Sequence, residues 1–246
     1  MKLSVNIKEL WLRSSTEEKE LLHDINFTLE EKNVYTILGK NGSGKSTLIK
    51  SLSGLNDINT CFIKGEIAVD NINTVTASTD ELLYLRKEKI KYVFQDPANS
   101  FDPLRKLDYY FRRFKLDHIK AQELLSYLFL PSLKELGGMY PYELSGGMAQ
   151  RLSFVIAVLM NPELLILDEP TSGIDPAIAN LFLIKIKEFA NKEKRTVLLV
   201  TQDINFAESV GGYTAHISAG TLSSFVESTE YFNSDSMLFN KNRDLL

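Results

Sequence analysis

The segment GKNGSGKST, residues 39–47, constrains the fold of this chain more than any other stretch. A short apolar run, VYTIL, precedes it and predicts a buried strand. The following residues, TLIKSLSGL, place Leu48, Leu52 and Leu55 on one helical face. The order strand, glycine loop, helix is that of a phosphate-binding loop in an α/β fold.

The spacing Gly39-x4-Gly44-Lys45-Ser46 gives this segment its chemistry. The glycines let backbone N–H groups wrap nucleotide phosphates. Lys45 reaches the β and γ phosphates, and the Ser46 hydroxyl can ligate Mg²⁺. The predicted nucleotide-binding residues of the segment are Gly39, Asn41, Gly42, Ser43, Gly44, Lys45, Ser46 and Thr47.

A second motif, LLILDEP, follows more than a hundred residues later, at residues 164–170. Its apolar strand delivers Asp168 to a carboxyl end, where ligands bind in open α/β sheets. Asp168 is predicted to hold Mg²⁺, directly or through water, and Glu169 to orient or deprotonate an attacking water. Gln95, at the end of the strand-like IKYVFQ, is a further candidate for contact with Mg²⁺ or water.

The octamer LSGGMAQR, residues 144–151, places two adjacent glycines before a predicted helix. Ser145 is a natural N-cap, but Gly146 and Gly147 leave the backbone bare. A helix N-terminus attracts anions. From the octamer alone, an anion arriving from outside and a flexible loop before a helix are both open.

Composition narrows the class of protein. The chain has 246 residues and a net charge of −4, so no strong basic field supports nucleic-acid binding. The single cysteine, Cys61, excludes an internal disulfide framework. The N-terminus lacks the apolar core of a signal peptide, and no apolar run approaches the ~20 residues of a membrane helix. A membrane role is therefore expected only through a partner.

The coarse organisation predicts one domain over residues 1–246. Residues 3–38 read mostly as strands, and residues 60–95 as further short strands. Residues 102–135 are charged and aromatic with helical spacing. From residue 163 the signature of a parallel sheet returns, and Asp175-Pro176 opens a helix. We expect residues 1–95 and 160–246 to form the core with its β subdomain, and about 96–159 an inserted helical subdomain.

In this order, GKNGSGKST, Gln95, LSGGMAQR, LLILDEP and SGID resemble the ATP-binding subunit of an ABC transporter. The resemblance implies a P-loop NTPase of the ABC ATPase fold, α/β, with an N-terminal antiparallel β subdomain and an inserted α-helical subdomain. It implies ATP and Mg²⁺ as cofactors, with Asp175 among the nucleotide-binding residues. In such proteins two subunits close head to tail, so Ser145, Gly146 and Gly147 would bind the γ-phosphate of ATP held by the other subunit.

The stretches FQDPANSFDP and YPYELSGGMAQR are similar to the peptide and nickel importer branch. That resemblance implies ATP-driven uptake of peptides, nickel or metal chelates, at the cytoplasmic face of the membrane. Implied partners are a second, non-identical ATPase subunit, transmembrane permease subunits and, indirectly, a solute-binding protein. The aromatic and basic segment FDPLRKLDYYFRRFK predicts that residues 96–116 dock the permease, and the alternative for this segment is a solvated amphipathic helix. The alternatives are an ATP-binding regulatory subunit with a weak site of its own and a soluble ABC ATPase.

Two positions depart from the family pattern. Gln202 stands where the family has a His that contacts the γ-phosphate, and Gln cannot carry a proton charge at neutral pH. Hydrolysis at the chain's own phosphate loop is therefore in doubt, while ATP binding is not. Ser14 stands near the usual adenine-stacking aromatic. Trp11 is three residues earlier, on the opposite face of a regular strand, and would serve only if the strand bulges.

Overall fold

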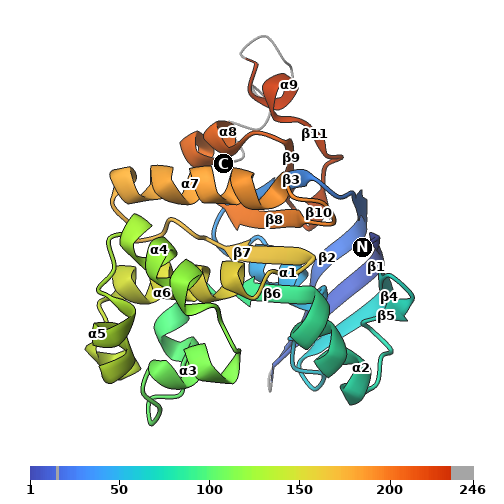
Figure 1. Cartoon of the computed structure of the whole chain (residues 1–246). Coiled ribbons are helices and arrows are strands. Elements are labelled where there is room, and N and C mark those ends of the chain that lie inside the picture. The colour runs from blue at the N-terminus through green and yellow to red at the C-terminus, as the bar shows by residue number, and fades with distance from the viewer. Residues whose placement is uncertain (15–16, 234–246) are drawn as a thin grey trace.

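The computed structural model describes residues 1–14 and 17–233. The described strands form two sheets, and helices lie around them on several sides (Figure 1). The antiparallel sheet lies to the right in this view, and the helices α3 to α6 lie at the lower left.

The antiparallel sheet has the strand order β2-β1-β4-β5. Its strands are β1 (Leu3–Arg13), β2 (Glu18–Leu29), β4 (Cys61–Val69) and β5 (Ile72–Asn73). Alternate residues of β1, including Leu3, Val5 and Ile7, are buried, as expected for a sheet with one covered face. The pairing of β1 shifts register against β4 between Ile7 and Glu9, and against β2 between Leu10 and Trp11.

The second sheet follows the order β10-β9-β3-β8-β7-β6, and β11 also pairs with β9. Its five parallel members in the described chain are β6, β7, β8, β3 and β9. The strands are β3 (Asn33–Leu38), β6 (Ile90–Val93), β7 (Leu164–Asp168), β8 (Thr196–Thr201), β9 (Tyr213–Ser218), β10 (Thr221–Leu222) and β11 (Val226–Glu227).

The central strands are buried on both faces, which explains their continuous apolar sequences. On β7, Leu164 and Ile166 pack in the core shared with α1 (Lys45–Ser51) and the antiparallel sheet. Leu165 and Leu167 point the other way, into the core formed with the larger helices. Asp168 continues the series of Leu164 and Ile166, so its side chain lies on the same face of the sheet as theirs.

Helices cover the sheet face that carries Leu165 and Leu167. They are α3 (Asp108–Arg113), α4 (His118–Tyr127), α5 (Leu133–Gly138), α6 (Gly146–Leu159), α7 (Pro176–Ala190) and α8 (Ile204–Val210). The last described helix, α9 (Ser228–Phe232), forms a separate cluster with Ala207 of α8. The buried residues of α3 to α6 share one hydrophobic core with the sheet and with α7. The subdomain limits at 96–159 stay a prediction.

The prediction of short strands throughout residues 60–95 is wrong over residues 79–89. There the chain forms α2 (Thr79–Tyr84), which continues into a π-helical turn, Leu85–Lys89. Ser78 and Glu81 form a capping box, in which each side chain accepts a backbone N–H of the other residue. Within the described ranges, every helix is too short or too polar to cross a membrane.

Candidate nucleotide-binding and hydrolysis site

The phosphate loop connects β3 to α1 and requires glycine at two positions. A Cβ on Gly39 would lie 2.5 Å from the Ile217 side chain. Gly44, the N-cap of α1, has φ +99, and a Cβ there would lie 2.8 Å from Leu22. The loop backbone therefore approaches its surroundings more closely than any side chain permits, so that its N–H groups remain available to a ligand.

Lys45 lies inside this loop and is only 5% exposed. Its ammonium donates to the carbonyl oxygens of Gly39 at 2.6 Å and Lys40 at 3.0 Å. The Nζ atom also lies 3.5 Å from Oε1 of Glu169. A buried cation held at the loop by neutral carbonyls is well placed to meet phosphate oxygens.

Asp168 ends β7 and is 2% exposed. Its Oδ1 accepts the Ser46 hydroxyl at 3.0 Å, which joins the two predicted metal-binding residues. Both donate oxygen, the atom that Mg²⁺ prefers, and Mg²⁺ sites need few protein ligands when phosphates and water supply the rest. The described residues contain no cluster of three His, Cys, Asp or Glu side chains suited to a metal. The residues present fit Mg²⁺.

Tyr92 is a site residue that the sequence did not predict. Its hydroxyl donates to Oδ2 of Asp168 at 2.7 Å. Burial, foremost, and the neighbouring Asp168 carboxylate raise the pKa of Tyr92, so its hydroxyl keeps its proton at physiological pH. The available sequence signal was its position in IKYVFQ, three residues before Gln95.

Glu169 has a left-handed backbone, φ +46, held by a bond from its N–H to the Val200 carbonyl at 3.0 Å. Its Oε2 accepts the backbone N–H of Gln202 at 3.2 Å. In the described chain, the buried Oε1 has no hydrogen-bond partner and faces the Lys45 ammonium. One oxygen is thus fixed and the other retains its acceptor capacity, an arrangement suited to a carboxylate that must orient water.

Gln202 follows β8 directly and is exposed. Its backbone N–H positions Glu169, a contact that any residue except proline would provide at this place. The Gln202 amide therefore adds its own chemistry only toward a ligand.

A cavity of about 260 Å³ adjoins the phosphate loop. Besides loop residues, its lining includes Gln95, Glu169, Leu12 and Leu21. Neither predicted aromatic position, Ser14 or Trp11, is among the described residues that line it. The Trp11 indole donates instead to Glu9 at 3.3 Å.

The cavity wall is aliphatic at Leu12 and Leu21, two lining residues that the sequence did not predict. Trp11 is opposite Glu20 and Phe62 in the antiparallel sheet. Leu21 falls at the register shift of β2 against β1, so regular alternation does not predict its direction. The register shift thus brings Leu21, not Trp11, to the cavity.

The octamer LSGGMAQR, residues 144–151, leads into α6 and forms its first residues. Ser145 is its N-cap, and its hydroxyl accepts the Met148 N–H at 3.2 Å. A Cβ built on Gly146 would meet no atom of the described chain within 4 Å, and one on Gly147 only the Gly173 carbonyl at 3.8 Å. Ser145, Gly146 and Gly147 do not line the described cavity at the chain's own phosphate loop.

Asp175 has an observed structural contact. As predicted from Asp175-Pro176, it is the N-cap of α7, and its carboxylate accepts the Ala177 N–H at 2.8 Å. Asp175 is exposed, and its Oδ2 does not take part in the bond to Ala177.

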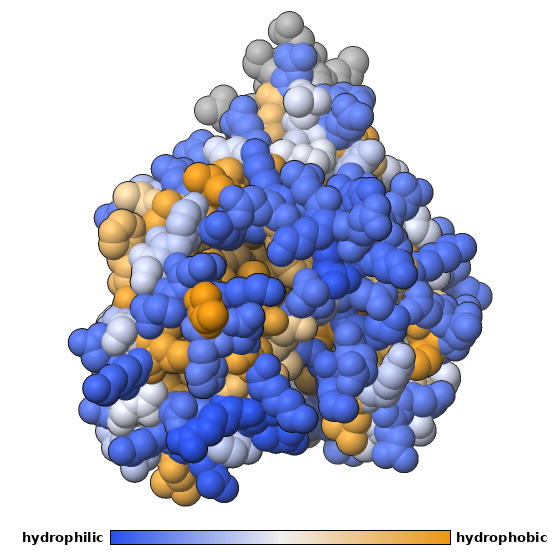
Figure 2. All heavy atoms as spheres, viewed as in Figure 1, coloured by the Kyte–Doolittle hydropathy of each residue, from blue (hydrophilic) through white to orange (hydrophobic). Residues whose placement is uncertain are grey.

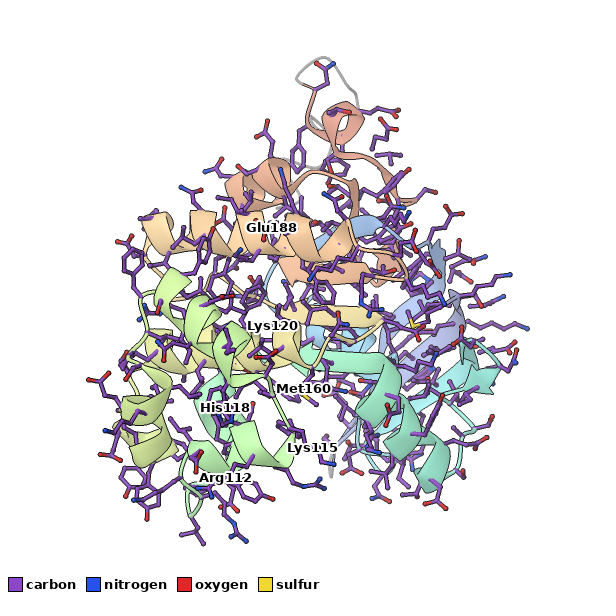
Figure 3. The ribbon with its side chains drawn as sticks, in the orientation of Figure 1. Arg112, Lys115, His118, Lys120, Met160 and Glu188 are labelled. Carbon is purple, nitrogen blue, oxygen red and sulfur yellow. The ribbon has the colours of Figure 1, made fainter. Side chains whose placement is uncertain are left out.

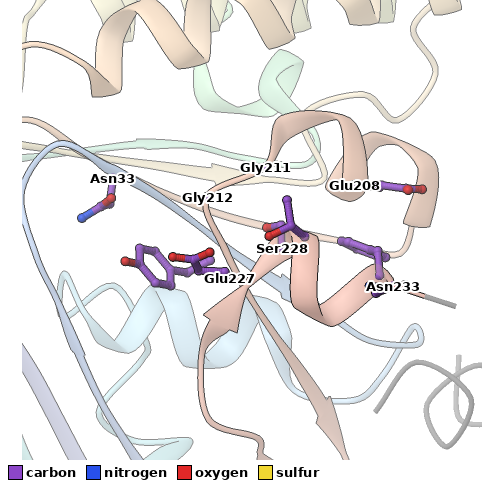
Figure 4. Close-up of a pocket in the computed structure, with 10 residues that line it drawn as sticks. Asn33, Glu208, Gly211, Gly212, Glu227, Ser228 and Asn233 are labelled. Carbon is purple, nitrogen blue, oxygen red and sulfur yellow. The ribbon is translucent and has the colours of Figure 1, made fainter. Parts of the chain in front are cut away.

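A larger cavity, of about 680 Å³, lies away from the phosphate loop (Figure 4). Asn33, Gly212 and Ser228 are in its lining. Asn33 begins β3, so this cavity is at the amino end of the strand whose carboxyl end carries the phosphate loop. Ligands of open α/β sheets bind at carboxyl ends, which favours the smaller cavity as the functional one.

The parallel sheet, the glycine loop before α1 and the paired Ser46 and Asp168 define a P-loop nucleotide-binding protein. The family model described as ABC transporter matches residues 22–172. The chain belongs to this family, and ATP is the nucleotide that the family binds.

The relatives agree with the predicted branch. The oligopeptide transport ATP-binding protein OppD of Lactococcus lactis subsp. cremoris (strain SK11) is 31% identical over 213 residues. That alignment covers 83% of this chain but only 63% of OppD, so the chain spans just under two thirds of that relative. OppF of Streptococcus pyogenes serotype M1 is 28% identical, with 93% of this chain and 76% of OppF covered. The resemblance to the peptide importer branch is confirmed.

Solved structures confirm the predicted fold class. A dimeric bacterial ABC transporter cassette aligns with a TM-score of 0.78 and 26% identity, covering 93% of this chain and 99% of the other. The cbiO1 structure from Clostridium perfringens, part of the transporter complex cbiONQ, has a TM-score of 0.73 and 25% identity, covering 99% and 95%.

Proposed function

We propose that this chain is the ATP-binding and ATP-hydrolysing subunit of a peptide importer. One observation carries the proposal: Lys45, Ser46, Asp168 and Glu169, far apart in sequence, meet at the carboxyl ends of β3 and β7. The names of the relatives, oligopeptide transport proteins, support the substrate class. Uptake of nickel or metal chelates stays a prediction.

The chemistry follows from the positions of these side chains. Lys45 neutralises charge on the β and γ phosphates, and the loop N–H groups from Gly39 to Thr47 surround them. Ser46 and Asp168, with Gln95 at the rim of the cavity, would hold Mg²⁺, which neutralises phosphate charge when bound. Glu169, fixed through one oxygen, orients the attacking water with the other.

The exposed start of α6 supports a second ATPase subunit as partner. Ser145, Gly146 and Gly147 present free backbone toward solvent, beyond the chain's own cavity. A helix N-terminus with bare glycines suits the γ-phosphate of ATP carried by another subunit. Asp175 is the N-cap of α7 and lies two residues after Gly173, whose carbonyl is close to Gly147. In that arrangement Asp175 would belong to the same interface. We propose a partner that is a non-identical relative.

We also propose that residues 96–116 dock a membrane permease, which places the chain peripherally at the cytoplasmic face. Leu104 is 85% exposed and Tyr109 41% exposed, and they line a surface depression with Arg105 and Arg113. Figure 2 shows apolar patches within the hydrophilic surface over these helices. Figure 3 shows basic side chains, including Arg112, on the same region.

A regulatory subunit that binds ATP but hydrolyses it poorly is the second candidate. Gln202 favours it, because the side chain at this position cannot take up a proton as the expected His could. This candidate shares the phosphate loop and differs only in turnover at that loop.

The test is peptide uptake by the complex that copurifies with this chain, reconstituted in vesicles. We expect uptake into the vesicles to require ATP inside them, on the side of this subunit, and to disappear with Lys45→Ala. Uptake that is independent of ATP, or a chain that binds no nucleotide, would refute the proposal. ATP binding with normal uptake and no turnover at the chain's own loop would select the regulatory candidate.

A further inference from the structure

Tyr92 lies on the sheet face that carries the metal-binding residues. In the parallel pairing of β6 with β7, Tyr92 is opposite Ile166. Asp168 lies two residues further along β7, so its side chain points to the same face as Ile166. The Tyr92 ring extends along this face, and its hydroxyl reaches Oδ2 of Asp168 at 2.7 Å.

The two oxygens of Asp168 therefore have separate partners. Oδ1 accepts the Ser46 hydroxyl at 3.0 Å, and Oδ2 accepts the Tyr92 hydroxyl. The carboxylate is 2% exposed, so Oδ2 has little access to replacement water. The Tyr92 ring is itself packed against Phe94, with ring centroids 4.4 Å apart. A rigid aromatic donor thus fixes the rotation of a buried carboxylate.

We propose that Tyr92 is a positioning residue, which holds Asp168 so that a single oxygen, Oδ1, faces the divalent cation beside Ser46. This inference rests on the proposed function of the site. Mg²⁺ requires near-ideal octahedral geometry and is poorly served by a carboxylate free to rotate or to bind through both oxygens. A hydrogen bond to the second oxygen removes that freedom, as partners of metal ligands commonly do.

The Tyr92→Phe variant removes the hydroxyl and retains the ring. We expect about a tenfold rise in the Mg²⁺ concentration that half-saturates binding of a fluorescent ATP analogue, at the lower end of the 10–100-fold range for such partners. Affinity for the analogue in EDTA should stay within about twofold, since Tyr92 makes no contact with the phosphate loop in this account. Purified full-length chain is used, and thermal unfolding is recorded for each variant.

Two controls separate positioning from packing. Tyr35→Phe removes another buried tyrosine hydroxyl, which accepts the Glu30 N–H at 2.9 Å, and should leave the Mg²⁺ dependence unchanged. Phe94→Leu disturbs the packing of the Tyr92 ring without removing its hydroxyl. In an Asp168→Asn background, Tyr92→Phe should have no further effect on Mg²⁺ half-saturation, because Tyr92 acts through Asp168.

The proposal is overturned if Tyr92→Phe leaves Mg²⁺ half-saturation unchanged, or weakens binding equally in EDTA and Mg²⁺. It is also overturned if Tyr35→Phe gives the same shift. If Tyr92→Phe fails to unfold cooperatively, the test passes to Phe94→Leu, where a loosened ring should raise Mg²⁺ half-saturation by a smaller factor and no rise refutes positioning. Failure of the proposed function is distinguishable, because the unaltered chain would then bind no analogue, or would bind it without any dependence on Mg²⁺.

Discussion

Replacing Glu169 by glutamine tests the assignment of the water-orienting base with little change in shape. The amide oxygen can still accept the Gln202 N–H, now at 3.2 Å from Oε2. The ion pair with Lys45 is lost, but Lys45 keeps its bonds to the Gly39 and Lys40 carbonyls. We expect a decrease in the free energy of unfolding of about 1–3 kcal/mol, because the buried Lys45 ammonium loses the charge of the Glu169 carboxylate.

The effect on hydrolysis at the chain's own phosphate loop should be much larger. A positioned base contributes about 10²–10⁴-fold to the rate, which raises the barrier by about 2.7–5.4 kcal/mol at 1.36 kcal/mol per tenfold. The assay is single-turnover ATPase of the assembled complex, with ATP affinity measured in parallel and expected to be retained. Glu208→Gln, an exposed glutamate of α8, is the matched control. Hydrolysis by Glu169→Gln at the unaltered rate would mean that Glu169 is not a working base and that turnover is confined to the partner's phosphate loop.

Three further outcomes can be checked on the same preparations. Lys45→Ala should weaken ATP binding by at least about tenfold, the equivalent of one charge-assisted hydrogen bond (about 1.4 kcal/mol), in a titration with a fluorescent analogue; unchanged affinity would remove the lysine from the phosphate site. Leu12→Tyr should tighten ATP binding several-fold by stacking, since Leu12 and Leu21 are the aliphatic side chains among the described residues that line the cavity; no gain would place the base elsewhere. Leu104→Cys, made in a Cys61→Ser background, should crosslink to a membrane subunit; crosslinks within this chain alone would contradict docking.

The sequence predicted the parts of the site that depend on local order. Strand, loop and helix around Lys45 follow from neighbouring residues, and so do Asp168 at a strand end and Asp175 as a helix cap. The helix at Thr79–Tyr84 was missed although Ser78 and Glu81 carry the spacing of a capping box. Its short length left no apolar periodicity to detect.

Other parts depend on register between distant strands, which no local pattern contains. Tyr92 reaches Asp168 only because β6 pairs with β7 in one particular alignment. Leu21 joins the cavity because the pairing of β1 and β2 shifts beside Trp11. A one-residue change in register exchanges the two faces of a strand, so the face of a residue is known only with its partner.

Substitution of Gly146 tests, without disturbing the fold, whether the start of α6 contacts ATP that is held by another subunit. A Cβ at this position meets nothing within 4 Å in the described chain. Since alanine also favours helices over glycine by up to about 1 kcal/mol, Gly146→Ala should leave the free energy of unfolding unchanged or slightly higher. ATP binding at the chain's own loop should be unaffected, because Gly146 does not line that cavity. Any loss of turnover must then arise where a second molecule covers the start of α6.

A comparison of substitutions at Gly146 and at Gln202, by the turnover that each one loses, distinguishes a symmetric from an asymmetric enzyme. If the partner is a non-identical chain that retains the His replaced here by Gln202, the competent site consists of the partner's phosphate loop and this chain's Ser145, Gly146 and Gly147. Steady-state ATPase of the purified complex should then fall further with Gly146→Asp than with Gln202→Ala, and this chain alone should turn over ATP poorly. Gln202→His should raise activity modestly, since it restores a titratable ring beside Glu169. Robust hydrolysis by this chain alone, with Gln202→Ala as damaging as Gly146→Asp, would mean that the Gln202 amide replaces the histidine and that both sites of a symmetric dimer work.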